Sequence, residues 1–407
     1  MLNNNNSVPA IRFKGFTAAW EQRKLGEVAE FSKGSGYSKG DLVSEGTPII
    51  LYGRLYTKYE TVIEDVDTFA KVKKKSVFSQ GGEVIVPSSG ETAEDIARAS
   101  VVATADIILG GDLNVIKPNS SIHPAFLAVT ISNGKQQIEL SKRAQGKSVV
   151  HINNSDLKDV VLQLPSLPEQ TAIGTFFRIL DELLTSNQRK VDGLKKMKSA
   201  YLQQMFPQTR EHVPRVRFDG FSDSWEKGKL GELLIKNSEK NTGQLISNVE
   251  SVSNKFGFVK QTEYFEERQI ASKDTSNYYV IRKGAFAYNP SRINVGSIAV
   301  KKNDDTSIVS PLYISFYIGD KIAETFLWNW FKTSAFEQDR QFSTAGGVRD
   351  TLSYEALQDI SISLPSFVEQ VAIGNFFLAL EEQISTQSKM VDNLKALKTA
   401  YLQKMFI

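Results

Sequence analysis

Apolar residues recur every three or four positions through two long segments of the chain, which begin near residues 166 and 366. The pattern predicts two long helices, each with one apolar stripe that must pair with another helix. Ser166 with Glu169, and Ser366 with Glu369, fit a capping box at each helix start. The residues expected to pair the helices are Ile173, Phe177, Leu180, Leu194 and Tyr201 in the first, and Ile373, Phe377, Leu380, Leu394 and Tyr401 in the second.

The two helical segments are copies of each other, because residues 164–206 and 364–406 are identical at 23 of 43 positions. An opening segment is also repeated: VPAIRFKGFTAAWEQRKLG starts at Val8 and VPRVRFDGFSDSWEKGKLG starts at Val213. Between these matched blocks, the inserts over 27–163 and 232–363 agree only at scattered positions. A duplicated frame with diverged inserts predicts a pseudo-twofold molecule that presents two different recognition surfaces.

The inserts contain runs of alternating or β-branched residues, which predict strands. These runs cover 83–87, 103–116 and 159–164 in the first insert, and 278–281, 285–288, 308–317 and 359–364 in the second. Helical patterns cover 124–141 and 323–339. We therefore expect an α+β fold with two mixed α/β domains that share one fold, joined by two long antiparallel coiled-coil helices. The expected segments are a domain over 1–164, a helix over 165–206, a domain over 207–364 and a helix over 365–407.

The length of the predicted helices makes them a candidate spacer. A helix of about 38 residues is about 57 Å long, and an antiparallel pair would hold the two inserts at a fixed separation. Duplex DNA repeats about every 34 to 36 Å, which is a comparable scale. Asn187 and Gln387 interrupt the two stripes at the same point, where polar residues can fix the register. The alternative for the helices is a stalk that only dimerises the protein.

Composition says less than the repeats do about the class of function. The chain has 407 residues, 41% of them hydrophobic and 23% charged, as is usual for a soluble protein, and it has no cysteine for disulfides or thiolate chemistry. It has neither an apolar leader nor a run of about 18 apolar residues, so we expect a cytoplasmic protein that does not contact membrane. The net charge is +3, but residues 25–164 carry −2 and residues 230–364 carry −1. Bulk charge therefore does not indicate a nucleic-acid partner.

Three catalytic motifs fail in this sequence. Asn289 and Pro290 are followed by Ser291 and Arg292, so the second proline and the aromatic residue of an adenine methyltransferase loop are missing. The triplet Gly146, Lys147, Ser148 lacks the earlier glycine of a P-loop. Asp156 and Lys158, a candidate nuclease pair, are not repeated in the second copy. We therefore expect no catalytic, cofactor or metal site, and the histidines His123, His151 and His212 are too scattered to suggest one.

The repeated motifs resemble the specificity subunit of type I restriction-modification systems. The resemblance rests on LPSLPEQ and LPSFVEQ, IGTFF and IGNFF, AYLQQMF and AYLQKMF, and the repeated RFxGFxxxWExxKLGE opening. It implies that the inserts are target recognition domains, each reading one half of a split double-stranded DNA site, and that the helices set the gap and dock two modification subunits. It also implies that S-adenosylmethionine, ATP and magnesium act in the modification and restriction subunits, and that this chain is not itself an enzyme.

Base recognition would then depend on Arg, Lys, Asn, Gln and Ser in the polar loops of the inserts, with further cations on phosphates. The DNA-contact candidates are Arg54, Lys58, Ser88, Ser89, Arg143 and Lys147 in the first insert, and Asn289, Ser291, Arg292, Asn294, Arg340 and Arg349 in the second. Each residue is about as readily explained as a solvated or turn-forming side chain. A two-armed protein-binding scaffold without catalytic activity remains the alternative function, and a steep salt dependence of DNA affinity would distinguish the two.

Overall fold

The computed structural model describes residues 8–146, 149–208, 211–261, 274–344 and 351–406. The chain divides into two compact units, residues 1–190 with 387–407 as unit 1 and residues 191–386 as unit 2. Each long helix contributes residues to both units, so the units cut across the four segments expected from the sequence. No helix among the described residues is long and apolar enough to cross a membrane.

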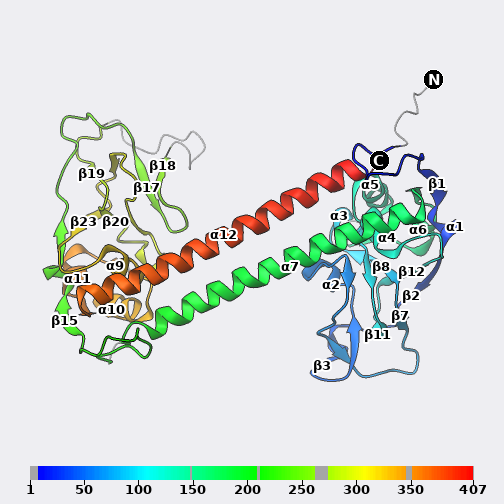
Figure 1. Ribbon diagram of the computed structural model, residues 1–407, viewed down its shortest axis with the longest axis horizontal. Coiled ribbons are helices and arrows are strands. Elements are labelled where there is room, and N and C mark those ends of the chain that lie inside the picture. The colour runs from blue at the N-terminus through cyan, green and yellow to red at the C-terminus, as the bar shows by residue number, and fades with distance from the viewer. Residues whose placement is uncertain (1–7, 147–148, 209–210, 262–273, 345–350, 407) are drawn as a thin grey trace. The chain divides into compact units, whose positions relative to one another are not determined.

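Unit 1 is built on two five-stranded sheets, with strand orders β2-β12-β8-β10-β5 and β3-β6-β4-β11-β7 (Figure 1). Two small sheets, β1-β14 and β13-β9, complete it. Its strands are β1 (Glu21–Lys24), β2 (Ala29–Lys33), β3 (Leu42–Val43), β4 (Thr47–Ile50), β5 (Val62–Ile63), β6 (Phe69–Ala70), β7 (Phe78–Gln80), β8 (Glu83–Pro87), β9 (Ser89–Gly90), β10 (Ser100–Val102), β11 (Ala105–Leu109), β12 (Leu113–Pro118), β13 (Val150–His151) and β14 (Val161–Leu164). Its short helices are α1 (Leu25–Val28), η1 (Lys39–Asp41), α2 (Arg54–Thr57), α3 (Ala93–Ile96), α4 (Pro124–Ile131), α5 (Gly134–Arg143) and α6 (Asn154–Lys158).

Unit 2 has one four-stranded sheet, β16-β23-β20-β21, and the two-stranded sheets β15-β24, β17-β18 and β19-β22. Its strands are β15 (Glu226–Lys229), β16 (Leu234–Lys236), β17 (Glu250–Ser253), β18 (Gly257–Lys260), β19 (Tyr279–Ile281), β20 (Phe286–Tyr288), β21 (Ile298–Val300), β22 (Ser307–Val309), β23 (Ile314–Ile318) and β24 (Ser361–Leu364). Its short helices are η2 (Leu230–Glu232), η3 (Ile293–Val295), α9 (Glu324–Trp330), α10 (Ser334–Thr344) and α11 (Tyr354–Asp359).

The two inserts share a core despite their divergent sequences. The order β2-β12-β8-β10 in unit 1 matches the order β16-β23-β20-β21 in unit 2, and every pairing within these four strands is antiparallel. The prediction of one fold for both inserts is therefore confirmed at this core. Outside it the units differ, because β10 continues to β5 in unit 1, whereas β21 ends the four-stranded sheet in unit 2.

The predicted elements are mostly present, but the longer ones are divided. The stretch 103–116 forms β11 and β12, separated by a turn in which Asp112 has a left-handed backbone with φ of 58°. The stretch 308–317 likewise forms β22 and β23, and the helical patterns at 124–141 and 323–339 each form two helices. The sequence pattern joined neighbouring elements because the turns between them are short: residues 110–112 separate β11 from β12, and residues 310–313 separate β22 from β23.

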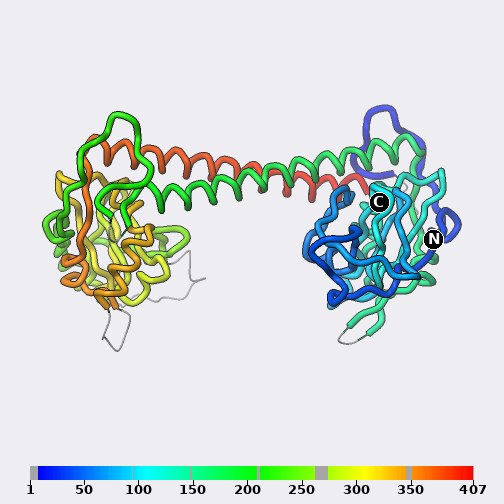
Figure 2. Tube along the Cα trace, turned by 90° about the horizontal axis from the view of Figure 1, so that it is seen from below, coloured from blue at the N-terminus to red at the C-terminus, as the bar shows by residue number. Residues whose placement is uncertain are grey.

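The long helices α7 (Leu167–Gln204) and α12 (Phe367–Met405) pack against each other within each unit. In unit 1 the start of α7 supplies Ile173, Phe177 and Leu180 to a buried cluster that Leu394 and Tyr401 of α12 also contact. In unit 2 the start of α12 supplies Ile373, Phe377 and Leu380, which pack with Leu194 and Tyr201 of α7. Figures 1 and 2 both show, within unit 1, the red end of α12 alongside the start of α7. The expected pairing residues thus line the packed faces.

A repeated ion pair joins each opening segment to the start of a long helix. Arg12 Nε and Nη2 donate to the two carboxylate oxygens of Glu169 at 2.8 and 2.6 Å, and Arg217 binds Glu369 in the same way at 2.6 and 2.8 Å. Each glutamate is 1% exposed. The glutamate half of each capping box predicted at residues 166 and 366 is therefore wrong, because both glutamate side chains bind arginine. The serine half is confirmed at the second helix, where Ser366 Oγ accepts from Glu369 N at 3.3 Å.

The glutamine that follows each of these glutamates fixes the helix to its recognition domain. Gln170 Oε1 accepts from His123 N at 2.9 Å, just before α4, and its amide donates to Ser121 O at 3.1 Å. Gln370 repeats this at α9, where its Oε1 accepts from Ala323 N at 2.9 Å and its amide donates to Lys321 O at 3.1 Å. The repeated motif residues are thus the contacts that orient each domain on its helix.

Candidate nucleic-acid interface

Two polar loops of unit 1 that are distant in sequence meet at one end of the sheet. Strand β9 follows the central strand β8, and it pairs with β13 so that Ser89 lies opposite His151. The hydroxyl of Ser89 lies 3.1 Å from His151 Nδ1. Buried Asn114 joins the same two segments, because its amide donates to Pro87 O at 3.3 Å and to Ile152 O at 3.0 Å. The structure thus brings Ser88 and Ser89 beside the segment that contains Gln145.

Unit 2 repeats this convergence with different residues. Strand β20 occupies the place of β8, and Pro290, just after it, accepts a hydrogen bond from Leu352 N at 3.1 Å, as Ser88 accepts one from Ile152 N at 3.1 Å. The hydroxyl of Tyr288 donates to Leu352 O at 3.2 Å. Burial raises the pKa of Tyr288 above its usual range, so the hydroxyl keeps the proton that it donates. In each unit, therefore, the segment just after the equivalent strand accepts the same backbone hydrogen bond from a segment that lies about 60 residues later in the sequence.

The loop over 289–297 in unit 2 displays most of the predicted contact residues of that unit. Its ends are closed by Asn289 N donating to Ser297 O at 3.0 Å, and Asn289 Oδ1 accepts from Ser291 N at 3.1 Å. Ser291, Arg292 and Asn294 are exposed. Arg292 has no ion-pair partner among the residues that the structure describes, so its guanidinium is available to an incoming ligand. An ordered loop with exposed donors suits base or phosphate recognition.

Two arginines predicted to contact DNA are instead buried in ion pairs. Arg54 has a side chain 8% exposed, and it donates to Asp67 at 2.7 Å, to Glu60 at 2.8 Å and to Asp65 O at 2.8 Å. Arg340 is 2% exposed and binds Glu337 through two bonds of 2.8 Å. Their burial argues against the DNA contacts predicted for them, because moving either guanidinium would leave carboxylates unpaired.

Four further residues predicted to contact DNA are Lys58, Arg143, Lys147 and Arg349. Lys58 is exposed and pairs with Asp67 at 2.9 Å, and the pKa of Asp67 falls to about 2 beside the Lys58 ammonium and the Arg54 guanidinium. Arg143 pairs with Glu139 at 2.8 Å along α5. Lys147 and, in the second insert, Arg349 lie outside the described residues. The contacts predicted for these four residues stay predictions.

The converging loops of unit 1 border an open polar cavity of about 620 Å³. Its lining residues are Lys33, Ser88, Ser89, Asp112, Gln145, His151, Asn153, Ser155 and Asp156. Lys33 has its pKa lowered by burial, although the nearby carboxylates of Asp112 and Asp156 favour its charged form. Because the cavity holds carboxylates as well as a cation, it suits hydrogen bonding to polar groups better than binding of a bare phosphate.

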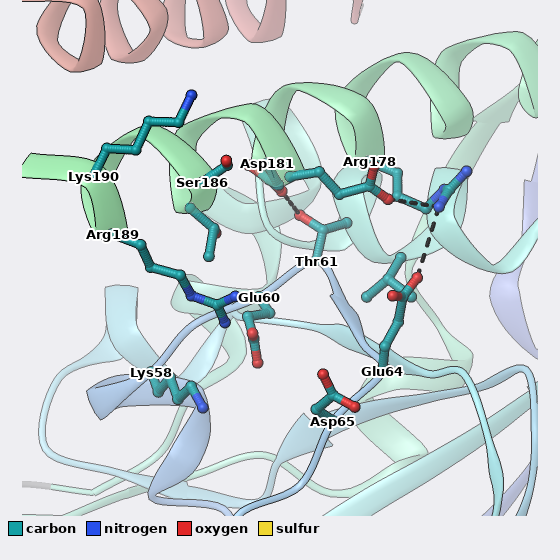
Figure 3. A pocket seen from close by; sticks show the side chains of 13 residues that line it. Lys58, Glu60, Thr61, Glu64, Asp65, Arg178, Asp181, Ser186, Arg189 and Lys190 are labelled. Atoms are coloured by element: carbon teal, nitrogen blue, oxygen red, sulfur yellow. Dashed lines mark hydrogen bonds and ion pairs between the residues drawn. The ribbon is translucent and has the colours of Figure 1, made fainter. Parts of the chain in front are cut away.

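A second cavity of unit 1, about 550 Å³, lies between α7 and the segment that follows α2 (Figure 3). Arg178 pairs there with Glu182 at 2.6 Å and with Glu64 at 3.6 Å, and Arg189 and Lys190 also line it. On its floor, Thr61 donates to Asp181 at 2.5 Å. Its five carboxylates offset its four cations, so it has no excess of positive charge that would attract DNA.

Some residues at these surfaces could not be predicted from the sequence, because only tertiary contacts bring them there. Lys33 and Asp112 enter the first cavity from strand ends with no motif to mark them. The hairpin of β17 and β18 in unit 2 lies beside loop 289–297, since Asn254 Nδ2 donates to Val295 O at 3.2 Å. The sequence NKFG at its tip is a turn signal that could have been noticed. Among the described residues, no group of three or more acidic or histidine side chains is placed to hold a metal ion.

Comparison with known proteins gives consistent matches. Residues 18–196 match the family described as the type I restriction modification DNA specificity domain. The MjaVIII specificity subunit of a type I restriction enzyme from Methanocaldococcus jannaschii is 19% identical over 400 residues, which span 93% of this chain and 90% of that protein. A putative MjaX specificity subunit from the same organism is 20% identical, over 93% of this chain and 91% of that protein.

Solved structures give the same fold. The S subunit of a type I restriction-modification system from M. genitalium has a TM-score of 0.63 at 16% identity, and the match covers 98% of this chain and 99% of that one. A chain from a structure described as the basis of complex assembly and conformational transition of the type I R-M system has a TM-score of 0.51 at 16% identity, over 96% of this chain and 98% of that one.

Proposed function

We propose that this chain is a specificity subunit of a type I restriction-modification system, and that it reads a DNA target made of two separate halves. The family recognises DNA sequence within a restriction-modification complex and is not catalytic in itself. In this proposal unit 1 reads one half of the target and unit 2 reads the other. The paired helices α7 and α12 set the gap between the halves.

The observation that carries the proposal is the repeated convergence of two polar loops. The same place in the shared sheet presents Ser88, Ser89 and His151 in unit 1, and Ser291 and Arg292 in unit 2. One framework with different side chains at one position is what two different half-sites require. Local donors supply the attraction, because the domains carry no net positive charge.

The partners of the chain are proposed to be two methyltransferase subunits and, for cleavage, restriction subunits. S-adenosylmethionine would act in the methyltransferase subunits, and ATP and magnesium in the restriction subunits. Exposed apolar residues on the helices support such docking: Ile179 and Leu183 of α7 are each 45% exposed in unit 1, and Leu378 of α12 is 41% exposed in unit 2. Replacing Ile179 and Leu183 with serine should abolish co-purification with the methyltransferase subunit without lowering the unfolding midpoint.

Methylome sequencing tests the proposal. Cells that express the chain with its methyltransferase subunits should show methylated adenines in one interrupted motif. Replacing residues 27–163 with the insert of another such subunit should change one half of that motif and leave the other half and the gap intact. A continuous motif, or a change in both halves, would contradict the proposal. Failure to bind duplex DNA, with capture of two different proteins, would favour the scaffold alternative.

A further inference from the structure

The hairpin of β17 and β18 in unit 2 ends in a short exposed turn, residues 254–256, which we call the hairpin tip. The strands pair in antiparallel register up to Ser253 opposite Gly257. Ser253 Oγ accepts from Lys255 N at 3.2 Å and from Phe256 N at 3.3 Å. Gly257 adopts a left-handed φ of 68°, which glycine allows without strain. These contacts fix the backbone of the tip before any ligand arrives.

Buried contacts anchor the root of the hairpin to the shared sheet. Lys301 of unit 2 is 1% exposed and donates to Glu250 of β17 at 2.6 Å, and Ser307 Oγ donates to the same carboxylate at 2.6 Å. Val252 packs in one apolar cluster with Ala299 of β21. A buried ion pair of this kind holds one geometry strongly, because separating its partners would leave a desolvated charge. The hairpin is therefore a stiff projection.

The hairpin tip lies against the loop that carries Arg292. Asn254 Nδ2 donates to Val295 O at 3.2 Å, and Ser297 Oγ at the end of the loop donates to Val252 O at 3.0 Å. The tip and the loop thus form one surface. Val295 is 51% exposed within it, and Lys255 and Arg292 are exposed beside it.

The cations of this surface differ from neighbouring cations of unit 2 in their lack of an ion-pair partner among the described residues. Lys283 and Lys302 of unit 2 pair with carboxylates, as do Arg282 and Lys301. Lys255 has no ion-pair partner among the described residues, and its ammonium lies 5.0 Å from the ring centre of Phe256. Two exposed cations that have no carboxylate partner among the described residues, on one stiff surface, suit a polyanion. A two-stranded ribbon also fits the major groove of duplex DNA.

We infer that the hairpin tip is a DNA-contact element of unit 2, in which Lys255 binds a backbone phosphate beside the bases read by loop 289–297. The inference rests on the proposed function and adds a contact that only the second half-site receives. In unit 1 the outer neighbour of β10, the counterpart of β21, is β5, whereas in unit 2 β21 packs against the hairpin through Ala299 and Val252. Lys255 positions the loop on the duplex and does not select sequence, because a phosphate is the same for every base.

The test compares Lys255→Gln with wild type in the complex with methyltransferase subunits, bound to a duplex that carries the methylated motif. The salt dependence of affinity, plotted as log K against log salt, should become less steep by about 0.9. Affinity near 0.1 M salt should fall about fivefold, while the methylome motif stays unchanged. Phosphate ethylation should interfere with wild-type binding at one position in the second half-site and lose that effect in the variant.

Lys236→Gln is the matched control. Lys236 has a side chain 54% exposed and lies on β16, at the opposite edge of the four-stranded sheet from β21. This variant should keep the wild-type slope, and both variants should keep the wild-type unfolding midpoint. An unchanged slope and ethylation pattern in Lys255→Gln would overturn the inference alone. A wild-type complex without salt-dependent affinity for the motif would overturn the proposed function and the inference together.

Discussion

Lys198 of α7 donates to Glu381 of α12 at 2.5 Å within unit 2, and Lys398 of α12 pairs with Asp181 of α7 within unit 1. The two lysines occupy equivalent positions of the two helices, and so do the two carboxylates. The lysine of the pair therefore comes from α7 in unit 2 and from α12 in unit 1. Each carboxylate also binds its recognition domain, since Glu381 accepts from Lys332 at 2.9 Å and Asp181 accepts from Thr61 at 2.5 Å. These carboxylates therefore join three elements: two helices and a domain.

Exchanging the charges of the first pair tests this junction. Lys198→Glu or Glu381→Lys alone should lower the free energy of unfolding by about 1 to 2 kcal/mol, because each places like charges side by side in a half-buried site. Glu381→Lys should be the more damaging, because it also confronts Lys332. The double variant should recover part of the loss of Lys198→Glu. Urea unfolding of the four proteins measures the coupling, and purely additive losses would contradict it.

Arg12→Gln should lower the free energy of unfolding strongly, although Arg12 lies near the surface. It leaves the Glu169 carboxylate, 1% exposed, without its two charged hydrogen bonds, so we expect a loss of about 3 to 5 kcal/mol in unfolding free energy. Arg215→Gln is the control, because Arg215 has a side chain 66% exposed and pairs with Glu211 on the surface. That change should cost far less, because water screens an exposed ion pair. Similar losses in the two variants would contradict a special role for the Arg12–Glu169 ion pair.

Lys332 should make stability depend on alkaline pH. Burial lowers the pKa of Lys332 from 10.5 to about 8, although Glu381 favours its charged form. Between these values the unfolded chain holds a proton that the folded chain has lost, so this residue's contribution to stability rises as pH rises. The stability of wild type relative to Lys332→Met should therefore increase from pH 8 to 10. A flat difference between wild type and Lys332→Met over this pH range would argue against the shift.

Removing one heptad from each long helix should shorten the recognised gap. Deleting 191–197 together with 391–397 keeps the apolar register of both helices, because a heptad is close to two turns. Methylome sequencing should then find the same two half-sites with fewer bases between them, or no methylation if the shortened frame cannot assemble. Full methylation at the original gap would exclude the helices as the spacer.

The sequence alone was enough to predict the two long helices of this protein and many strands of its inserts. Helical periodicity depends on neighbours three and four residues apart, so the spacing of Ile173, Phe177 and Leu180 already specified a buried face. The repeat indicated that α12 would do the same, and β-branched runs indicated strands such as β8, which occupies the range predicted for it. Loop composition also drew attention to Ser88, Ser89 and Arg292, which the structure places in the converging loops.

Only the tertiary structure decided which charged side chains are paired with other residues of the protein. Glu169 looked like a capping residue, but its partner Arg12 lies 157 positions earlier in the chain. Arg54 looked like an available cation until its pairing with Asp67 and Glu60 buried it. No local pattern marks Lys255, which the folded chain places beside loop 289–297. Local patterns report interactions between near neighbours, whereas the burial and pairing of a charge depend on segments that meet only when the chain has folded.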